Sequence, residues 1–264
     1  MSEWKEYNRL GESRFGKFLY NFHDIYIGRS IELYGEYSHG ETEMFQQLVK
    51  PGQVALDVGS NVGYHTIGLA NMVGPQGTVV AFEPQRIIFQ TMCANVAINN
   101  LSNVRTWHAA VGSSPGELLV PMLDYAAPSN FGGLALGQYQ KGERVRVMTI
   151  DQLSLNKCDF IKIDVEGMEE EVLQGAVNTI SRHQPIIYTE CNRADQAESL
   201  VRRIHALGYD MYFHRPPLFN PDNFKQHSEN VFGNIISKNL LCVSRGRNIV
   251  VDGLKKLEVP GLSS

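Results

Sequence analysis

Short apolar runs alternate with longer amphipathic segments from residue 51 onward. The runs are rich in Val, Ile and Phe and are bounded by Gly, Pro or Asn, which is typical of buried strands. The predicted strands are residues 54–58, 79–82, 104–107, 160–165, 186–190, 209–213 and 239–243, with the last a candidate for antiparallel pairing. Apolar positions at helical spacing predict helices at residues 64–72, 87–99, 168–180 and 194–207.

Strands that alternate with helices predict a Rossmann-like α/β fold, in which a mostly parallel seven-stranded sheet carries helices on both faces. We expect residues 51–244 to form this domain, residues 1–50 a helical extension, and residues 245–264 a loosely held tail. Helical patterns in the extension lie at residues 14–21 and 41–49. A less regular stretch at 112–148 contains strand-like segments at 117–121 and 144–147 around a Gly-rich loop at 130–137.

Composition narrows the class of protein. The chain has 264 residues, of which 43% are hydrophobic and 20% charged, and its net charge is -4. These values predict one soluble domain and give no electrostatic support for binding nucleic acid. The charged N-terminus has no apolar core typical of a signal peptide, and no apolar stretch approaches the roughly 20 residues of a membrane helix. Four widely spaced cysteines favour reduced thiols and a cytoplasmic location.

The first strand of the domain leads into a glycine loop. Asp57 ends the strand, and Gly59, Ser60, Asn61 and Gly63 connect it to the next helix. Glycines let the backbone approach a ligand closely. Asn61 stands where a dinucleotide site would need its second glycine, which disfavours NAD. S-adenosylmethionine (SAM) carries no phosphate, and its cationic sulfonium and amine suit a carboxylate such as Asp57.

Glu83, followed by Pro84, ends the second strand. In Rossmann-type folds an acid at this place accepts hydrogen bonds from both ribose hydroxyls. The sequence therefore predicts that Glu83 binds a nucleoside sugar.

The fourth strand carries alternating charges. Lys162, Asp164 and Glu166 have the same parity and so point the same way. Because a buried charge is costly without a partner, Lys162 is expected to pair with a carboxylate. Asp164 or Glu166 could take the proton of an acceptor hydroxyl, and His65 is a further candidate base. The two other histidines considered for this role are His39 and His214.

Glu190 and Asn192 end the fifth strand. Together with Asp164 they resemble the oxygen ligands of magnesium-dependent O-methyltransferases. A divalent metal held by Asp164, Glu190 and Asn192 is therefore an alternative, but our prediction is a site without metal.

Several segments resemble the FkbM family of SAM-dependent methyltransferases. They are KPGQVALDVGSNVGYHTIGLA, VVAFEP, IDQL, CDFIKIDVEGMEEEVLQGA and PIIYTE, and they lie within about residues 40–192. The resemblance implies a class I methyltransferase sheet and mostly O-methylation of sugars, polyketides or related hydroxylated metabolites. It places the amino-acid end of SAM at Asp57, Gly59, Asn61 and Gly63.

The resemblance implies further contacts to SAM. Glu83 would bind the ribose, Asp164 would lie near the sulfonium or the acceptor, and Glu41 or Thr42 would close over the methionine end. The adenine would lie at the residues after the third strand, including Ala110.

The sequence says less about the identity of the methyl acceptor. The loop at 130–137 and everything after residue 192 match no family segment and are expected to form the acceptor pocket for a small molecule or carbohydrate. N- or carboxyl-methylation, and a non-catalytic SAM-fold binding protein, are the competing hypotheses. The aromatic N-terminal segment could pack on the core or on a second copy, so a homo-oligomer stays open.

Overall fold

The central element is a mixed sheet whose strands follow the predicted pattern. The computed structural model describes residues 5–137 and 139–258, so the ends of the predicted extension and tail lie outside the described residues. The strands, in order across the sheet, are β13 (Lys255–Lys256), β11 (Tyr209–His214), β12 (Asn239–Ser244), β10 (Ile186–Glu190), β9 (Phe160–Ile163), β3 (Val54–Val58), β4 (Thr78–Phe82) and β5 (Val104–Trp107). All seven predicted strands are present, and the two-residue β13 adds to them at one edge.

The direction of the strands also agrees with the prediction. The five strands from β10 to β5 are parallel to one another. Of the seven predicted strands, only β12 runs in the opposite direction, since it pairs antiparallel with both β10 and β11. The carboxyl ends of the parallel strands therefore meet at one edge of the sheet, where ligands bind in open α/β sheets.

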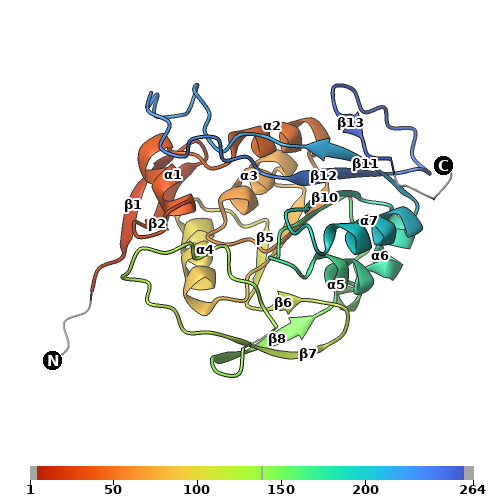
Figure 1. Ribbon diagram of the computed structural model, residues 1–264, viewed down its shortest axis with the longest axis horizontal. Helices are drawn as coiled ribbons and strands as arrows, with labels where there is room; N and C mark the ends of the chain where they lie inside the picture. The colour runs from red at the N-terminus through yellow and green to blue at the C-terminus, as the bar shows by residue number, and fades with distance from the viewer. Residues whose placement is uncertain (1–4, 138, 259–264) are drawn as a thin grey trace.

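Helices cover both faces of the sheet (Figure 1). One face packs against α5 (Glu169–Gln174), α6 (Val177–His183) and α7 (Ala197–Ala206). The other packs against α2 (His39–Leu48) and α3 (Tyr64–Val73). Alternation along β3 explains this, since Leu56 and Val58 face the first layer whereas Ala55 faces the second.

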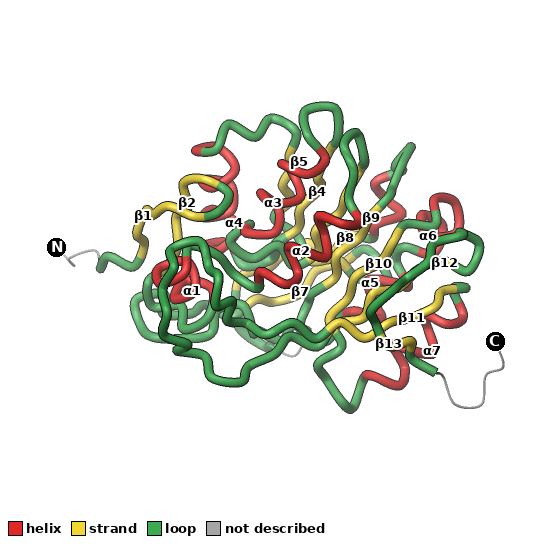
Figure 2. The backbone as a smooth tube through the Cα atoms, turned by 90° about the horizontal axis from the view of Figure 1, so that it is seen from above, coloured by secondary structure: helices red, strands yellow, loops and turns green. Residues whose placement is uncertain are grey.

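The N-terminal extension differs from the prediction. Residues 14–21 were expected to be helical, but β1 (Asn8–Ser13) and β2 (Gly16–Asn21) form an antiparallel hairpin instead. Phe18 and Tyr20 are buried while Lys17 is exposed, which is the two-residue period of a strand. The hairpin lies at the opposite end of the molecule from β13 (Figure 2).

Two further helices join the extension to the domain. α1 (Ile27–Tyr34) follows the hairpin and was not predicted, whereas α2 confirms the helix expected at 41–49. Asn95 of α4 (Arg86–Ile98) holds β2, since its side chain accepts a hydrogen bond from the Leu19 amide at 2.6 Å and donates to the Leu19 carbonyl at 2.9 Å.

Two other segments depart from expectation. The predicted helix at 168–180 is divided into α5 and α6 at Gly175, where a side chain would lie 2.1 Å from the Gly112 carbonyl oxygen. The tail is anchored as far as β13, because Leu257 packs on the core and the Arg247 guanidinium donates to the His183 carbonyl at 2.9 Å.

The irregular stretch forms a small separate sheet. β8 (Glu143–Met148) lies between β6 (Ala110–Val111) and β7 (Gly116–Val120), and the short 3-10 helix η1 (Ile150–Leu153) follows it. The loop at 130–137 leaves this sheet and returns to the carboxyl edge of the main sheet, where it lines a cavity. Within the described ranges, no helix has the length and apolar character needed to cross a bilayer.

Candidate active site

A cavity of about 310 Å³ lies at the carboxyl ends of β3, β4, β9 and β10. This volume is at the lower end of the range for small-molecule sites. The start of α1, the loop at 130–137 and the segment between β11 and β12 form its outer wall. In Figure 1 the last of these segments, drawn in blue, lies beside α1, although the two are far apart in sequence. The Lys225 ammonium joins them by donating to the Ile31 carbonyl at 3.0 Å.

Most predicted site residues line this cavity. They are Gly59, Ser60, Asn61, His65, Glu83, Pro84, Ala110, Asp164, Glu166, Glu190 and Asn192. The others are not among its lining residues: Glu41, Thr42, Asp57, Gly63, His39 and His214.

The glycine loop is shaped by its contact with Asp164, which follows the neighbouring strand β9. Gly59 has a φ of 80°, and a Cβ there would lie 1.8 Å from the Asp164 carbonyl oxygen, so only glycine fits. Asn61 also has a positive φ, of 50°, which asparagine tolerates better than most residues. Gly63 precedes α3 and packs against Met92. It makes the turn into α3, and its contact with SAM stays a prediction.

Glu83 is a buried carboxylate at the cavity wall. One oxygen accepts the Asn61 amide at 2.9 Å and the other accepts the Gln85 amide at 2.8 Å. Desolvation raises its pKa to about 7, although these two amides act in the opposite direction. A carboxylate has about four lone-pair positions, so each oxygen keeps the capacity to accept a further hydrogen bond. This arrangement suits the vicinal hydroxyls of a ribose, as the sequence predicted.

Asp57 is not among the residues that line the cavity, and its contact with SAM stays a prediction. Its side chain is 0% exposed and lies 3.1 Å from the Lys162 ammonium, and it accepts the Thr66 hydroxyl at 2.6 Å. Burial lowers the pKa of Lys162, but the Asp57 and Asp164 carboxylates outweigh it and raise that pKa overall. The predicted pairing of Lys162 is confirmed. The ammonium also donates to the Gly59 carbonyl at 3.1 Å, so this pair supports the glycine loop.

Glu41 and Thr42 are also absent from the cavity wall, and their contact with SAM stays a prediction. Glu41 lies behind His65, with its Oε2 3.4 Å from the His65 Nε2, and accepts the Asn239 amide at 2.9 Å. Burial raises the pKa of Glu41, but His65 outweighs it and lowers the pKa to about 2. Glu41 is therefore ionised and faces the ring of His65. Thr42 is buried in the same layer.

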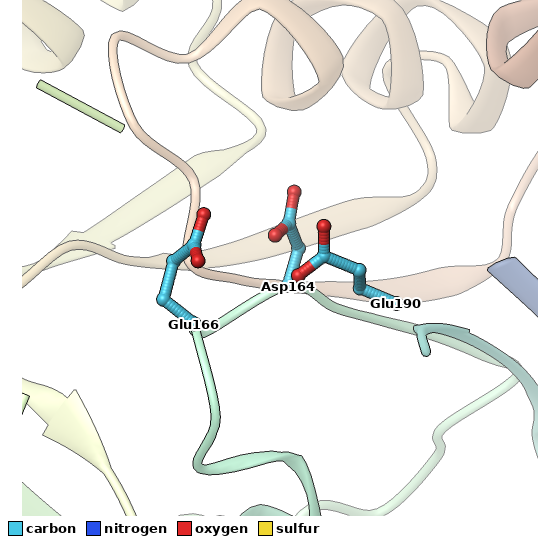
Figure 3. A group of neighbouring side chains, drawn as sticks. All are labelled: Asp164, Glu166 and Glu190. Carbon is cyan, nitrogen blue, oxygen red and sulfur yellow. The ribbon is translucent and has the colours of Figure 1, made fainter. Parts of the chain in front are cut away.

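Three carboxylates converge on the floor of the cavity (Figure 3). Asp164, Glu166 and Glu190 each offer an oxygen, and these oxygens lie within 4.8 Å of one another. Desolvation and the charges of Asp164 and Glu166 raise the pKa of Glu190 to about 9. Desolvation also raises the pKa of Asp164, although Lys162 opposes it from 3.6 Å. The three acidic groups therefore retain protons more readily than isolated carboxyl groups do, and a bound cation would favour their ionised forms.

Glu166 adds a carboxyl group to the predicted metal alternative of Asp164, Glu190 and Asn192. The side-chain nitrogen of Asn192 donates to Glu190 at 3.0 Å. Glu166 has a φ of 55° and receives the Arg193 guanidinium at 3.2 Å. Three carboxylates suit a hard divalent cation, yet the sulfonium of SAM would relieve the same charge. Our prediction stays a site without metal.

The other candidate bases lie elsewhere. The Nε2 of His39 is 3.6 Å from the Glu43 carboxylate, and the Nδ1 of His214 is 2.7 Å from the Tyr188 hydroxyl. Neither ring lines the cavity. The sequence analysis missed Gln85, whose amide donates to the Phe131 carbonyl at 2.7 Å and holds the 130–137 loop against the site. Its position directly after Glu83 and Pro84 was the available signal.

Comparison with known proteins identifies the family of the chain. Residues 57–211, more than half of the chain, match the "Methyltransferase FkbM domain" family. The chain is 24% identical over 148 residues to "Methyltransferase 1" of Beauveria bassiana (strain ARSEF 2860), covering 46% of this chain and 57% of that protein. It is 28% identical over 153 residues to "Methyltransferase sdnD" of Sordaria araneosa, covering 46% and 59%. The matches thus span less than two thirds of these relatives.

A solved structure shares the fold. The methyltransferase FkbM from Methylobacillus flagellatus KT superposes with a TM-score of 0.51 at 18% sequence identity, covering 76% of this chain and 50% of that one. The order of the strands, the cavity at their carboxyl edge and the extent of the family match agree, and the chain therefore belongs to the FkbM methyltransferase family.

Proposed function

We propose that the protein is a SAM-dependent methyltransferase that methylates a hydroxyl group on a small molecule or glycan. The observation that carries this proposal is the position of Asp164. Its half-buried carboxylate lies on the cavity floor beside the glycine loop, and desolvation raises its pKa toward the range suited to a general base.

The residues present fit SAM. Glu83 offers two acceptor oxygens to the ribose, and the backbone of Gly59 to Asn61 leaves room for the methionine end. Pro84 and Ala110 line the wall expected to hold the adenine. When bound, SAM supplies an electrophilic methyl group.

The chain's own residues provide acid–base chemistry and orientation. Asp164 accepts the proton of the acceptor hydroxyl, because a neutral hydroxyl is a poor nucleophile. The Lys162 ammonium donates to the Gly59 carbonyl and so holds the glycine loop beside Asp164. It also lies 3.6 Å from the Asp164 carboxylate and partly compensates its negative charge. His65, fixed by Glu41, closes the cavity on the side of α3.

The proposal is tested by measuring S-adenosylhomocysteine (SAH) formed from SAM with acceptors that carry only hydroxyl, only amine or only carboxyl groups. We expect turnover with hydroxyl acceptors and a product 14 Da heavier than the acceptor that survives mild base, as an ether does and an ester does not. Turnover confined to amines or carboxylates would support N- or carboxyl-methylation. SAH binding without turnover of any acceptor would favour a binding protein.

Glu83→Ala is expected to weaken SAH binding by about 1–3 kcal/mol, because it removes a charged acceptor of two hydroxyl groups. Isothermal titration calorimetry measures the change. Glu143→Ala is the control, since Glu143 pairs with Arg86 at 2.7 Å outside the cavity. Equal affinity of the two variants for SAH would contradict the assignment of Glu83 to the ribose.

The affinity for SAH is expected to rise with pH. Burial raises the pKa of Glu83 to about 7, so below that pH the group is a neutral acid that must lose its proton to accept both hydroxyls. Affinity should therefore increase roughly tenfold per pH unit up to about pH 7 and then level off. The same group makes the unliganded protein less stable as pH rises from 4.5 toward 7. Glu83→Gln should flatten the binding curve, and an unchanged slope in that variant would contradict the assignment.

A further inference from the structure

Several apolar side chains gather on the outer wall of the cavity. Tyr26 directly precedes α1, Leu134 and Leu136 belong to the 130–137 loop, and Ile235 and Ile236 come from the segment between β11 and β12. The two isoleucines remain 40% and 43% exposed. Half-exposed aliphatic side chains that gather from distant parts of a chain around one cavity are typical of a ligand-binding wall.

This wall is built from hydrogen-bonded backbone. The Leu218 amide donates to the Ile235 carbonyl at 3.0 Å, and the Ser237 amide donates to the Pro216 carbonyl at 2.9 Å. On the other loop, the Gly133 amide donates to the Asn130 side chain at 3.0 Å. The apolar side chains are therefore held at the cavity in a defined arrangement.

The floor opposite this wall is acidic, and it excludes anions. Asp164, Glu166 and Glu190 converge there. Among the described residues that line the cavity, Lys162 is the only lysine or arginine, and it is paired with Asp57 at 3.1 Å. A phosphate or carboxylate on the acceptor would lie beside the Asp164 and Glu166 carboxyl groups, and the described lining offers no unpaired lysine or arginine to attract it.

We propose that the acceptor is an amphipathic molecule with an apolar body and a hydroxylated end that carries no anionic group. The apolar body packs on the wall formed by Tyr26, Leu134, Leu136, Ile235 and Ile236. The hydroxylated end reaches Asp164. This proposal rests on the proposed function and specifies its substrate: free sugars lack the apolar body, and sugar phosphates carry the wrong charge.

The test compares three probes in the presence of saturating SAH, each below its critical micelle concentration. They are octyl β-D-glucopyranoside, methyl β-D-glucopyranoside and octyl phosphate, and calorimetry measures their affinities. We expect the octyl glucoside to bind at least tenfold more tightly than either of the others. Ile236→Asp should reduce its affinity at least tenfold. Val250→Asp should leave it unchanged, because Val250 is 82% exposed and does not line the cavity.

The outcomes separate this proposal from the proposed function. Equal binding of the two glucosides, tighter binding of octyl phosphate, or equal losses in the two aspartate variants would overturn the amphipathic acceptor. If the wild-type protein did not bind SAH, the cofactor itself would be wrong. If it bound SAH without preferring the octyl glucoside, only the acceptor would be wrong.

Discussion

Replacing Lys162 with methionine is expected to lower the free energy of unfolding by about 3–5 kcal/mol. The side chain of its partner Asp57 is 0% exposed, so the variant would leave a fully buried carboxylate without its cation. The Thr66 hydroxyl would remain as a neutral partner. The Gly59 carbonyl would lose its donor, so the glycine loop should loosen as well. Chemical denaturation at neutral pH measures the change.

The matched control for this prediction is Lys157→Met. Lys157 lies 3.4 Å from Asp159, but its side chain is 51% exposed, and exposed pairs contribute about 0–1 kcal/mol. The double variant Lys162→Met with Asp57→Asn should recover much of the loss, because the asparagine oxygen can still accept from Thr66 and no charge remains buried. Equal destabilisation by Lys162→Met and Lys157→Met would show that the buried pair does not support the fold.

The order of the strands was predictable because each buried strand leaves a short apolar run. Parity within these runs also predicted that Lys162 would need a carboxylate, and Asp57 is that partner. The hairpin β1–β2 was not predictable in the same way. Its aromatic residues fit either a helical or an alternating pattern, and only packing decides between them. Phe18 and Tyr20 are buried on the core side, which stabilises the strand.

The site was predictable to the extent that it depends on strand ends. Glu83, Asp164 and Glu190 lie at or near the carboxyl ends of predicted strands, and all three line the cavity. Asp57 lies near the end of β3, yet its side chain points to the layer of α3. Side chains alternate between the two faces up to the end of the strand, so Asp57 lies on the same face as Ala55. Glu41 shows a different limit. Its role depends on the distance between α2 and His65, and a sequence pattern does not contain such tertiary distances.

Asp164→Asn is expected to reduce kcat/KM by roughly 10²–10⁴, the usual effect of removing a general base. The asparagine side chain has nearly the same shape but cannot accept the proton of the acceptor hydroxyl. The affinity for SAH should change by less than about threefold, because the loss falls on the transition state. Single-turnover rates with the hydroxyl acceptor that the wild-type protein methylates measure the first effect, and calorimetry measures the second.

Glu166→Gln is the matched comparison, since it removes a charge from the same cavity floor. Glu166 receives the Arg193 guanidinium at 3.2 Å, and this pair opposes the rise in its pKa that desolvation and Asp164 cause. We expect Glu166→Gln to reduce kcat/KM by less than about tenfold. The pH–rate profile adds a readout that a structural effect would not produce: the rise of rate with pH that reports deprotonation of Asp164 should persist in Glu166→Gln and vanish in Asp164→Asn. If the two variants exchanged these behaviours, Glu166 would be the base. If both kept the wild-type rate, the acceptor would need no base, which is the behaviour expected of an amine.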